Sequence, residues 1–140
     1  MVKKKVVVGE IMRKKIVTVK PSLTVFEALR LMCQKNVEDL IIVKGKKPIG
    51  ILTESDLIKK VFVKELNPKT IKVLDIMSKP LVTVPPHYDI AAAATLMAKN
   101  NIRRLPIVEK GKLVGIVTVK ELIKHFRDYL NIIVRSVLFE

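Results

Sequence analysis

The stretch Gly50-Ile51-Leu52-Thr53-Glu54-Ser55-Asp56 returns 65 residues later as Gly115-Ile116-Val117-Thr118-Val119-Lys120-Glu121. Shifting the sequence by 65 residues aligns residues 8–59 with residues 73–124 without a gap, and 22 of the 52 aligned pairs are identical. A period of this size marks a repeated supersecondary unit. Because there are two copies and not many, the sequence predicts two similar units packed about a pseudo-two-fold axis, and not a solenoid.

Both repeats show the same order of predicted elements. Short β-branched runs before a proline predict strands, apolar residues at helical spacing predict a helix, and a glycine-containing turn between two apolar runs predicts a hairpin. A second helix follows each hairpin, over residues 54–63 and from residue 119 onward. The expected strands are residues 16–19, 40–43 and 49–53, and then 81–84, 105–108 and 114–118. The fold class is therefore α+β, with two β-α-β-β-α repeats.

The repeat sets the expected domain boundaries. These are residues 1–63 for the first repeat, 64–72 for a linker, 73–126 for the second repeat and 127–140 for a C-terminal helix extension. An apolar stripe on the last helix either covers the chain's own core or forms a dimer surface. Its members are Leu122, Phe126, Tyr129 or Leu130, Ile133 and Val137.

Composition limits the class of protein. The 140 residues are 49% hydrophobic and 29% charged, which suits a compact domain and not a disordered chain. No apolar run approaches the roughly 20 residues of a membrane span, and we expect a cytoplasmic protein with no membrane partner. The 27 basic and 13 acidic residues give a net charge of +14. This charge attracts polyanions such as nucleic acid or phosphorylated small molecules, or it serves solubility alone.

Catalytic chemistry is poorly supported. His87 and His125 are far apart and stand in no metal-ligand spacing. Cys33 excludes an internal disulfide and, beside the apolar Met32, is expected to pack in the core. No glycine-rich phosphate loop is present. We therefore expect no enzyme, no metal and no obligatory cofactor.

The segment around Thr53 is the most informative for binding. A strand is expected to end at Thr53 and a helix to begin within the next residues, so backbone N–H groups and the positive helix end meet there. Thr53 and Ser55 add hydroxyls, and the Asp56 carboxylate could accept two hydrogen bonds from a ribose diol. The alternative is local: Thr53 or Ser55 caps the helix, and Asp56 complements its dipole.

The repeated motifs resemble a pair of CBS domains, named for cystathionine β-synthase. The resemblance covers residues 8–126 and rests on the 65-residue period, Ile11-Met12, the Thr-Val-x-Pro strand end, Leu105-Pro106-Ile107-Val108, and Gly-Ile-x-Thr before a helix. It implies a tandem pair packed through its sheets, often as a disc-shaped homodimer. Such pairs commonly bind AMP, ADP or ATP, sometimes S-adenosylmethionine, and act as sensors.

Carried over by position, the resemblance implies a nucleotide site with residues from both repeats. The first repeat supplies Thr53, Ser55 and Asp56, and the second supplies Leu81, Val82, Thr83, Ile102, Arg103 and Arg104. The ribose-binding aspartate falls on Asp56, and the phosphate contact falls on Arg103 or Arg104. Leu81 and Ile102 would flank the adenine.

The equivalent second site departs from the pattern. Thr118 is retained, but Glu121 stands where aspartate belongs, and Val119 and Lys120 replace Glu54 and Ser55. Its facing residues are Val37, Glu38 and Asp39 in place of Ile102, Arg103 and Arg104. Two carboxylates near a phosphate position would repel it by about 1 kcal/mol each. We therefore expect unequal sites, with the nucleotide at the Asp56 site.

The sequence thus predicts a regulatory module that senses an adenine nucleotide and signals to a partner. An S-adenosylmethionine sensor is one alternative. A basic protein that binds nucleic acid through Lys3-Lys4-Lys5, Lys14-Lys15 and Lys44, Lys46 and Lys47 is another. Against it, no aromatic residues are interleaved with the basic clusters.

Overall fold

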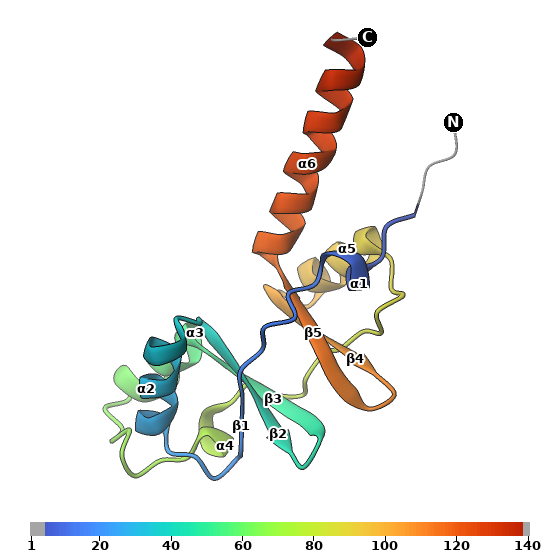
Figure 1. Ribbon diagram of the computed structural model, residues 1–140. Helices are drawn as coiled ribbons and strands as arrows, with labels where there is room; N and C mark the ends of the chain where they lie inside the picture. Colours follow the sequence, from blue (N-terminus) through green and yellow to red (C-terminus); the bar gives the residue numbers. More distant parts are fainter. Residues whose placement is uncertain (1–4, 139–140) are drawn as a thin grey trace. The chain divides into compact units, whose positions relative to one another are not determined.

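The computed structural model describes residues 5–138. Lys3 and Lys4 of the basic N-terminal run, and residues 139 and 140 of the expected extension, lie outside this range. The described chain mixes helices and strands, which confirms the α+β class (Figure 1). In chain order the elements are α1 (Val8–Ile11), β1 (Thr18–Val19), α2 (Val25–Lys35), β2 (Asp39–Lys44), β3 (Lys47–Thr53), α3 (Glu54–Leu57), the π-helix η1 (Ile58–Phe62), α4 (Val73–Ile76), α5 (Ile90–Lys99), β4 (Arg104–Glu109), β5 (Lys112–Thr118) and α6 (Val119–Leu138).

The chain forms two compact units that do not coincide with the sequence repeats. The first-repeat unit holds Lys15–Leu81 and Gly111–Leu113. The second-repeat unit holds the described residues up to Lys14, together with Val82–Lys110 and those from Val114 onward. Each repeat therefore gives its opening segment to the other unit: α1 belongs to the second-repeat unit and α4 to the first-repeat unit.

The first-repeat unit is built on a three-stranded sheet in the order β1-β2-β3. β1 runs parallel to β2, with Thr18 opposite Ile41, and β2 runs antiparallel to β3, with Leu40 opposite Leu52. Helix α2 buries Val25, Ala28 and Met32 in the same core as Leu40, Ile42 and Leu52. The sheet pattern follows from β-branched and aliphatic residues, whose branched side chains fit a buried pleated surface.

The ends of α2 match the local sequence signals. Thr24 caps the first turn by accepting from the Glu27 N–H, and the Glu27 carboxylate accepts from Thr24 in return. At the other end Asn36 takes the left-handed conformation, with φ 53°. Asp89 caps α5 in the same way, because its carboxylate accepts from the Ala92 N–H at the start of that helix.

Helix α4 completes the core of the first-repeat unit. The Val73 N–H donates to the Leu23 carbonyl at 2.9 Å, and the Val25 N–H donates to the Ile71 carbonyl at 3.0 Å. Val73 is fully buried, and Met77 packs against Gly50, where a Cβ atom would overlap the methionine side chain. The strand therefore approaches this segment closely because residue 50 has no side chain.

The second-repeat unit is similar but has less strand. β4 and β5 form a two-stranded sheet, and α1 is tied in by the Val8 N–H, which donates to the Tyr88 carbonyl at 2.8 Å. Met12 packs against Gly115 as Met77 packs against Gly50. Fully buried core residues include Val8, Leu105 and Val117.

Two expected elements differ in the structure. The strand expected over residues 81–84 is reduced to a single parallel bridge between Val84 and Ile107. In the first repeat the Ile41 N–H donates to the Val17 carbonyl at 3.0 Å, whereas the equivalent residue in the second repeat is Pro106, which has no N–H to donate to Val82. The helix expected over residues 54–63 is also divided, because α3 gives way after one turn to the wider π-helix η1.

One expected side-chain environment and two short helices also differ from what the sequence predicted. Cys33 is exposed, so the prediction that it packs in the core was wrong. The buried face of α2 follows Val25, Ala28 and Met32, and Cys33 lies one residue off that face. The short helices α1 and α4 were not predicted at all, because four residues are too few to show a helical period.

Helix α6 is one unbroken helix of 20 residues. None of its described residues is buried, and within the expected stripe Leu122 is the member that packs against its own core. Phe126 is 61% exposed and Val137 is 74% exposed. The stripe therefore does not serve mainly to cover the chain's own core. Among the described residues, no helix combines the length and apolar character that crossing a bilayer requires.

Candidate functional site

Thr53 ends β3 and caps α3. Its Oγ1 accepts a hydrogen bond from the Asp56 N–H at 3.3 Å. The Thr53 N–H and hydroxyl both donate to Asp56 Oδ2, at 3.0 and 3.1 Å. This reciprocal arrangement is a capping box, in which the carboxylate also lies in the favourable field of the helix N-terminus. The local capping role that the sequence allowed for Thr53 is present.

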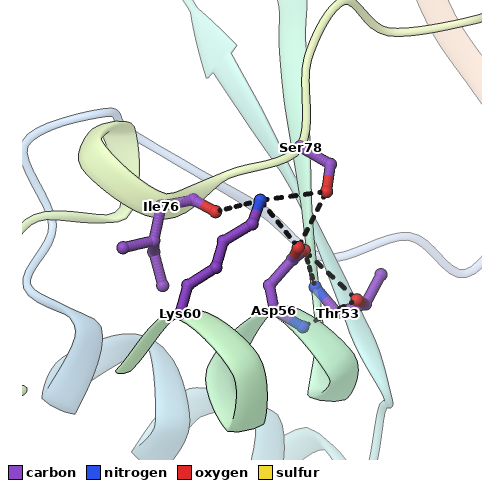
Figure 2. Close-up of polar contacts among 5 residues, drawn as sticks. All are labelled: Thr53, Asp56, Lys60, Ile76 and Ser78. Atoms are coloured by element: carbon purple, nitrogen blue, oxygen red, sulfur yellow. Dashed lines mark hydrogen bonds and ion pairs between the residues drawn. The ribbon is translucent and has the colours of Figure 1, made fainter. Parts of the chain in front are cut away.

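The second oxygen of Asp56 is also engaged. Ser78 donates its hydroxyl to Oδ1 at 2.8 Å, and Lys60 Nζ lies 3.0 Å from the same oxygen (Figure 2). The Asp56 side chain is 7% exposed. Several hydrogen-bond donors and a cation thus replace the water that burial removes from this side chain.

Lys60 ties this cluster to the segment that follows α4. Its Nζ donates to the Ile76 carbonyl at 3.0 Å and to the Ser78 hydroxyl at 3.4 Å (Figure 2). The Ser78 backbone pairs with Ile51 of β3 in both directions, with N···O distances of 2.8 and 3.2 Å. The Asp56 carboxylate therefore joins β3, the α3–η1 segment and the residues after α4 within one unit.

This geometry sets a condition for binding a ribose. Asp56 accepts two hydrogen bonds on each oxygen, so a diol can approach Oδ1 only if Ser78 or Lys60 moves away. Ser55, in contrast, is exposed on the first turn of α3. Leu81 belongs to the same unit and is half-buried.

The other five expected site residues belong to the second-repeat unit. Val82 and Ile102 pack against its core. Thr83 and Arg103 are exposed, and Arg104 is the half-buried first residue of β4. The Val84 bridge to Ile107 lays the segment that holds Val82 and Thr83 alongside β4.

Backbone contacts fix the Arg103 position. The Val119 N–H donates to the Arg103 carbonyl at 3.1 Å, so the start of α6 holds this residue in place. Within its own unit the structure therefore brings Val82, Thr83 and the two arginines into neighbouring segments. In the other unit it brings Thr53 into direct contact with Asp56.

The counterpart site at Thr118 is built differently. The Thr118 N–H and hydroxyl donate to Glu121 Oε1, at 2.8 and 2.6 Å, and repeat the capping contact. At the positions 65 residues from Lys60 and Ser78 stand His125 and Arg13. The residues at the positions of Lys60 and Ser78 therefore differ in charge and shape between the two repeats.

Two residues of this cluster were missed in the sequence. Lys60 stands four residues after Asp56, a spacing at which opposite charges meet on a helix, and this signal could have revealed it. Ser78 is 22 residues away and reaches Asp56 only through the pairing of its backbone with Ile51. Nothing in the local sequence around Ser78 indicates that contact.

Other chemistry in the described residues is limited. No group of three or more histidine, cysteine, aspartate or glutamate side chains there is arranged to hold a metal ion. The first-repeat unit has an apolar groove of about 530 Å³, whose lining includes Leu29, Leu57, Val61, Phe62 and Leu66. Its walls suit apolar groups and not phosphates.

Comparisons with known proteins show which family the chain belongs to. The model of the CBS domain family matches residues 8–63 and 73–128. An uncharacterized protein of Methanopyrus kandleri is 40% identical over 119 residues, which cover 84% of this chain and 61% of that protein. The fold and the repeated capped carboxylate thus define a duplicated α+β module, and the chain belongs to the CBS domain family as a tandem pair.

Solved structures show the same fold. A hexameric CBS-CP12 protein from bloom-forming cyanobacteria is 35% identical, with a TM-score of 0.81, and the match covers 86% of this chain and 68% of that one. The CBS domain pair of protein MJ0100, in complex with 5′-methylthioadenosine and S-adenosyl-L-methionine, is 25% identical. Its TM-score is 0.79, and the match covers 90% of this chain and 99% of that one.

Proposed function

We propose that this chain is a regulatory module that binds an adenine nucleotide, AMP, ADP or ATP, and signals that state to a partner protein. CBS pairs are regulatory ligand-binding modules. The observation that carries the proposal is the similarity to the pair of MJ0100, which was solved with two adenosine-containing ligands and matches 90% of this chain. In this proposal the chain is not an enzyme, needs no obligatory cofactor and works in the cytoplasm.

The proposed contacts use residues of both repeats. The adenosine part is assigned to Thr53, Ser55 and Asp56, with Leu81 and Ile102 beside the base. Val82 and Thr83 would contact the ligand through their backbone segment, and Arg103 and Arg104 would bind phosphate. Guanidinium groups bind phosphate oxygens through paired, charge-assisted hydrogen bonds. Two adjacent arginines favour a phosphorylated ligand over S-adenosylmethionine, which carries no phosphate and remains the alternative.

The Asp56 cluster supplies a way to transmit binding. A ribose diol that bonds to Oδ1 would replace the Ser78 hydroxyl or Lys60 Nζ, which lie 2.8 and 3.0 Å away. Lys60 also holds the Ile76 carbonyl, so its release would loosen the segment after α4. Ligand affinity must differ between the held and released arrangements for this to act as a signal.

Calorimetric titration of nucleotide-stripped protein tests the proposal. We expect AMP, ADP or ATP to bind, and Arg104→Ala and Asp56→Asn to weaken binding at least tenfold. Arg127→Ala and Asp128→Asn on exposed α6 are the matched controls and should leave affinity unchanged. The Glu121→Gln change tests the unequal sites and should have little effect on the same titration.

The outcomes separate the candidate functions. Heat with S-adenosylmethionine but not with the nucleotides would favour the alternative sensor. No heat with any of the four compounds would overturn the ligand proposal. Tight binding to nucleic acid that resists rising salt would support the nucleic-acid alternative, because binding by scattered lysines alone weakens steeply with salt.

We also propose that the chain works as an assembly of identical copies, in the simplest case a homodimer. The cyanobacterial protein of the comparison is hexameric, and the exposed apolar face of α6 is a surface that assembly could cover. Sedimentation velocity gives the mass directly, and a monomer at all concentrations would contradict this part of the proposal.

A further inference from the structure

Helix α6 carries an apolar seam that its own unit does not use. The seam residues follow one another at alternating steps of four and three: Val119, Ile123, Phe126, Leu130, Ile133 and Val137. Each is 40–74% exposed. Over the 20 residues of the helix, this seam is about 30 Å long.

The seam is distinct from the face that holds α6 to its unit. Leu122 packs against the second-repeat core and is not among the exposed large apolar residues. A register that starts from Leu122 would reach Tyr129 and then the polar Ser136 at the same heptad position. The register through Ile123 and Leu130 keeps apolar residues at every step, so it defines the available surface.

Alternating steps of four and three are the spacing of a coiled coil. They average 3.5 residues per turn, and two helices with this repeat pack their seams together by winding left-handedly. The family model ends at residue 128, whereas the seam continues through Leu130, Ile133 and Val137. This part of the surface therefore lies beyond the CBS module.

A second copy of this chain is the partner that fits the seam. In a symmetric pair the same surface meets itself, so the partner must present an equal length of the same repeat. Among the described helices of this chain, the next longest is α2, with 11 residues. Another α6 supplies the full match.

Charges beside the seam decide the orientation. In an antiparallel pair that overlaps fully, Arg127 of one helix would face Arg127 of the other, and like charges repel. In a parallel, in-register pair Arg127 faces Leu122, and Val134 faces Tyr129. The parallel pair thus avoids the repulsion and covers two further apolar side chains, Tyr129 and Val134, which are 47% and 46% exposed.

We propose that α6 of one copy pairs with α6 of a second copy as a parallel coiled coil through this seam. The inference rests on the proposed assembly of identical copies and names the surface that makes it. It does not depend on which ligand the chain binds.

The native mass of the full chain and of two variants tests the pairing. We expect the unchanged chain to have an even multiple of its 15.8 kDa mass. Leu130→Glu should at least halve that mass, because it places a charge in the seam. Asn131→Glu, one residue away and turned about 100° from Leu130 around the helix, should leave it unchanged. Equal masses for the chain and Leu130→Glu would overturn the proposal, as would an equal loss in Asn131→Glu.

Cysteine cross-linking tests the orientation without disturbing the seam by charge. In a Cys33→Ser background, Leu130→Cys should form a disulfide between copies under mild oxidation, because residue 130 meets its own equivalent in a parallel pair. Asn131→Cys is the matched control and should not. Absence of the Leu130→Cys cross-link would overturn the parallel pair.

Two more measurements separate this proposal from its competitors. Leu130→Glu should bind AMP or ATP as the unchanged chain does, so loss of the pair and loss of the ligand can be told apart. A basic amphipathic helix could instead lie on an anionic membrane. Cosedimentation of a monomeric chain with phosphatidylserine vesicles, prevented by Leu130→Glu, would overturn the coiled coil in favour of a lipid surface.

Discussion

Lys60 Nζ lies 3.0 Å from Asp56 Oδ1 and the same distance from the carbonyl oxygen of Ile76. One ammonium group therefore neutralises a buried carboxylate and also satisfies a carbonyl at the end of α4. Ser78 adds a second donor to the same carboxylate oxygen. The residues proposed to bind a ribose are thus also part of what holds the first-repeat unit together.

Replacing Lys60 with methionine should destabilise the protein. The change keeps the length of the aliphatic stem and removes the donor to Asp56 and Ile76. Because the Lys60 side chain is 38% exposed, solvent screens part of the charge interaction, and we expect a loss of about 1 kcal/mol in the free energy of unfolding. Urea unfolding measures it, with exposed Lys59→Met as the control. Equal stability of the two variants would show that the contact contributes nothing.

Gly50 and Met77 should be energetically coupled. A Cβ at residue 50 would come 2.8 Å from Met77 Cγ, so Gly50→Ala should cost about 1–3 kcal/mol by overpacking. Adding Met77→Ala removes the obstructing side chain, so the loss in the double variant should be smaller than the sum of the two single losses. Thermal or urea unfolding of the unchanged chain, the two single variants and the double variant measures this coupling.

The matched control for this coupling is Met12, which packs against Gly115 in the other unit. Gly50→Ala combined with Met12→Ala should be additive, because residues without shared partners do not couple. Additivity of Gly50→Ala with Met77→Ala would contradict the close packing of strand β3 against the segment after α4.

Glu65 occupies a backbone conformation that suits glycine. Its φ is 55°, in the left-handed region where a side chain meets the following carbonyl. Glu65→Gly should therefore raise the free energy of unfolding by about 0.5–1 kcal/mol, after the added freedom of the unfolded chain is subtracted. Glu54→Gly, in the first turn of α3, should lower it instead. A loss of stability in Glu65→Gly would contradict the assigned conformation.

The repeat made most of the fold predictable. Because the two repeats align over 52 positions without a gap, a strand, hairpin or helix predicted in one repeat is also predicted in the other. Residues that favour the N-cap position, such as Thr24 and Asp89, indicate where the helices begin. The strand expected at 81–84 is nearly absent because Pro106 stands where the first repeat has Ile41 and cannot donate the N–H that Ile41 gives to the Val17 carbonyl.

The candidate site was predictable in part. The capping contact between Thr53 and Asp56 follows from their spacing of three residues. The occupation of Asp56 Oδ1 by Ser78 does not, because it depends on a chain segment that joins the unit from beyond the linker. Sequence spacing describes neighbours on one helix, whereas this contact is set by tertiary packing.

Because α4 belongs to the first-repeat unit and α1 to the second-repeat unit, the structure predicts which fragments of the chain fold. A fragment of residues 8–63 follows the first match of the family model, but it lacks α4 and with it the buried residues Val73, Ile76 and Met77. A fragment of residues 15–81 keeps them, together with the backbone bonds from Val73 to Leu23 and from Val25 to Ile71.

We therefore expect the 15–81 fragment to be the more stable of the two, although both are near the size at which a single core becomes marginal. Loss of three buried apolar side chains removes on the order of 1.5–3 kcal/mol each, which is a large share of the stability of so small a unit. Circular dichroism during heating compares the fragments directly. Val73→Ala in the longer fragment should lower its melting temperature, whereas Leu74→Ala, at a side chain 43% exposed, should have a smaller effect. An 8–63 fragment that melts at the higher temperature would show that α4 is not part of this core.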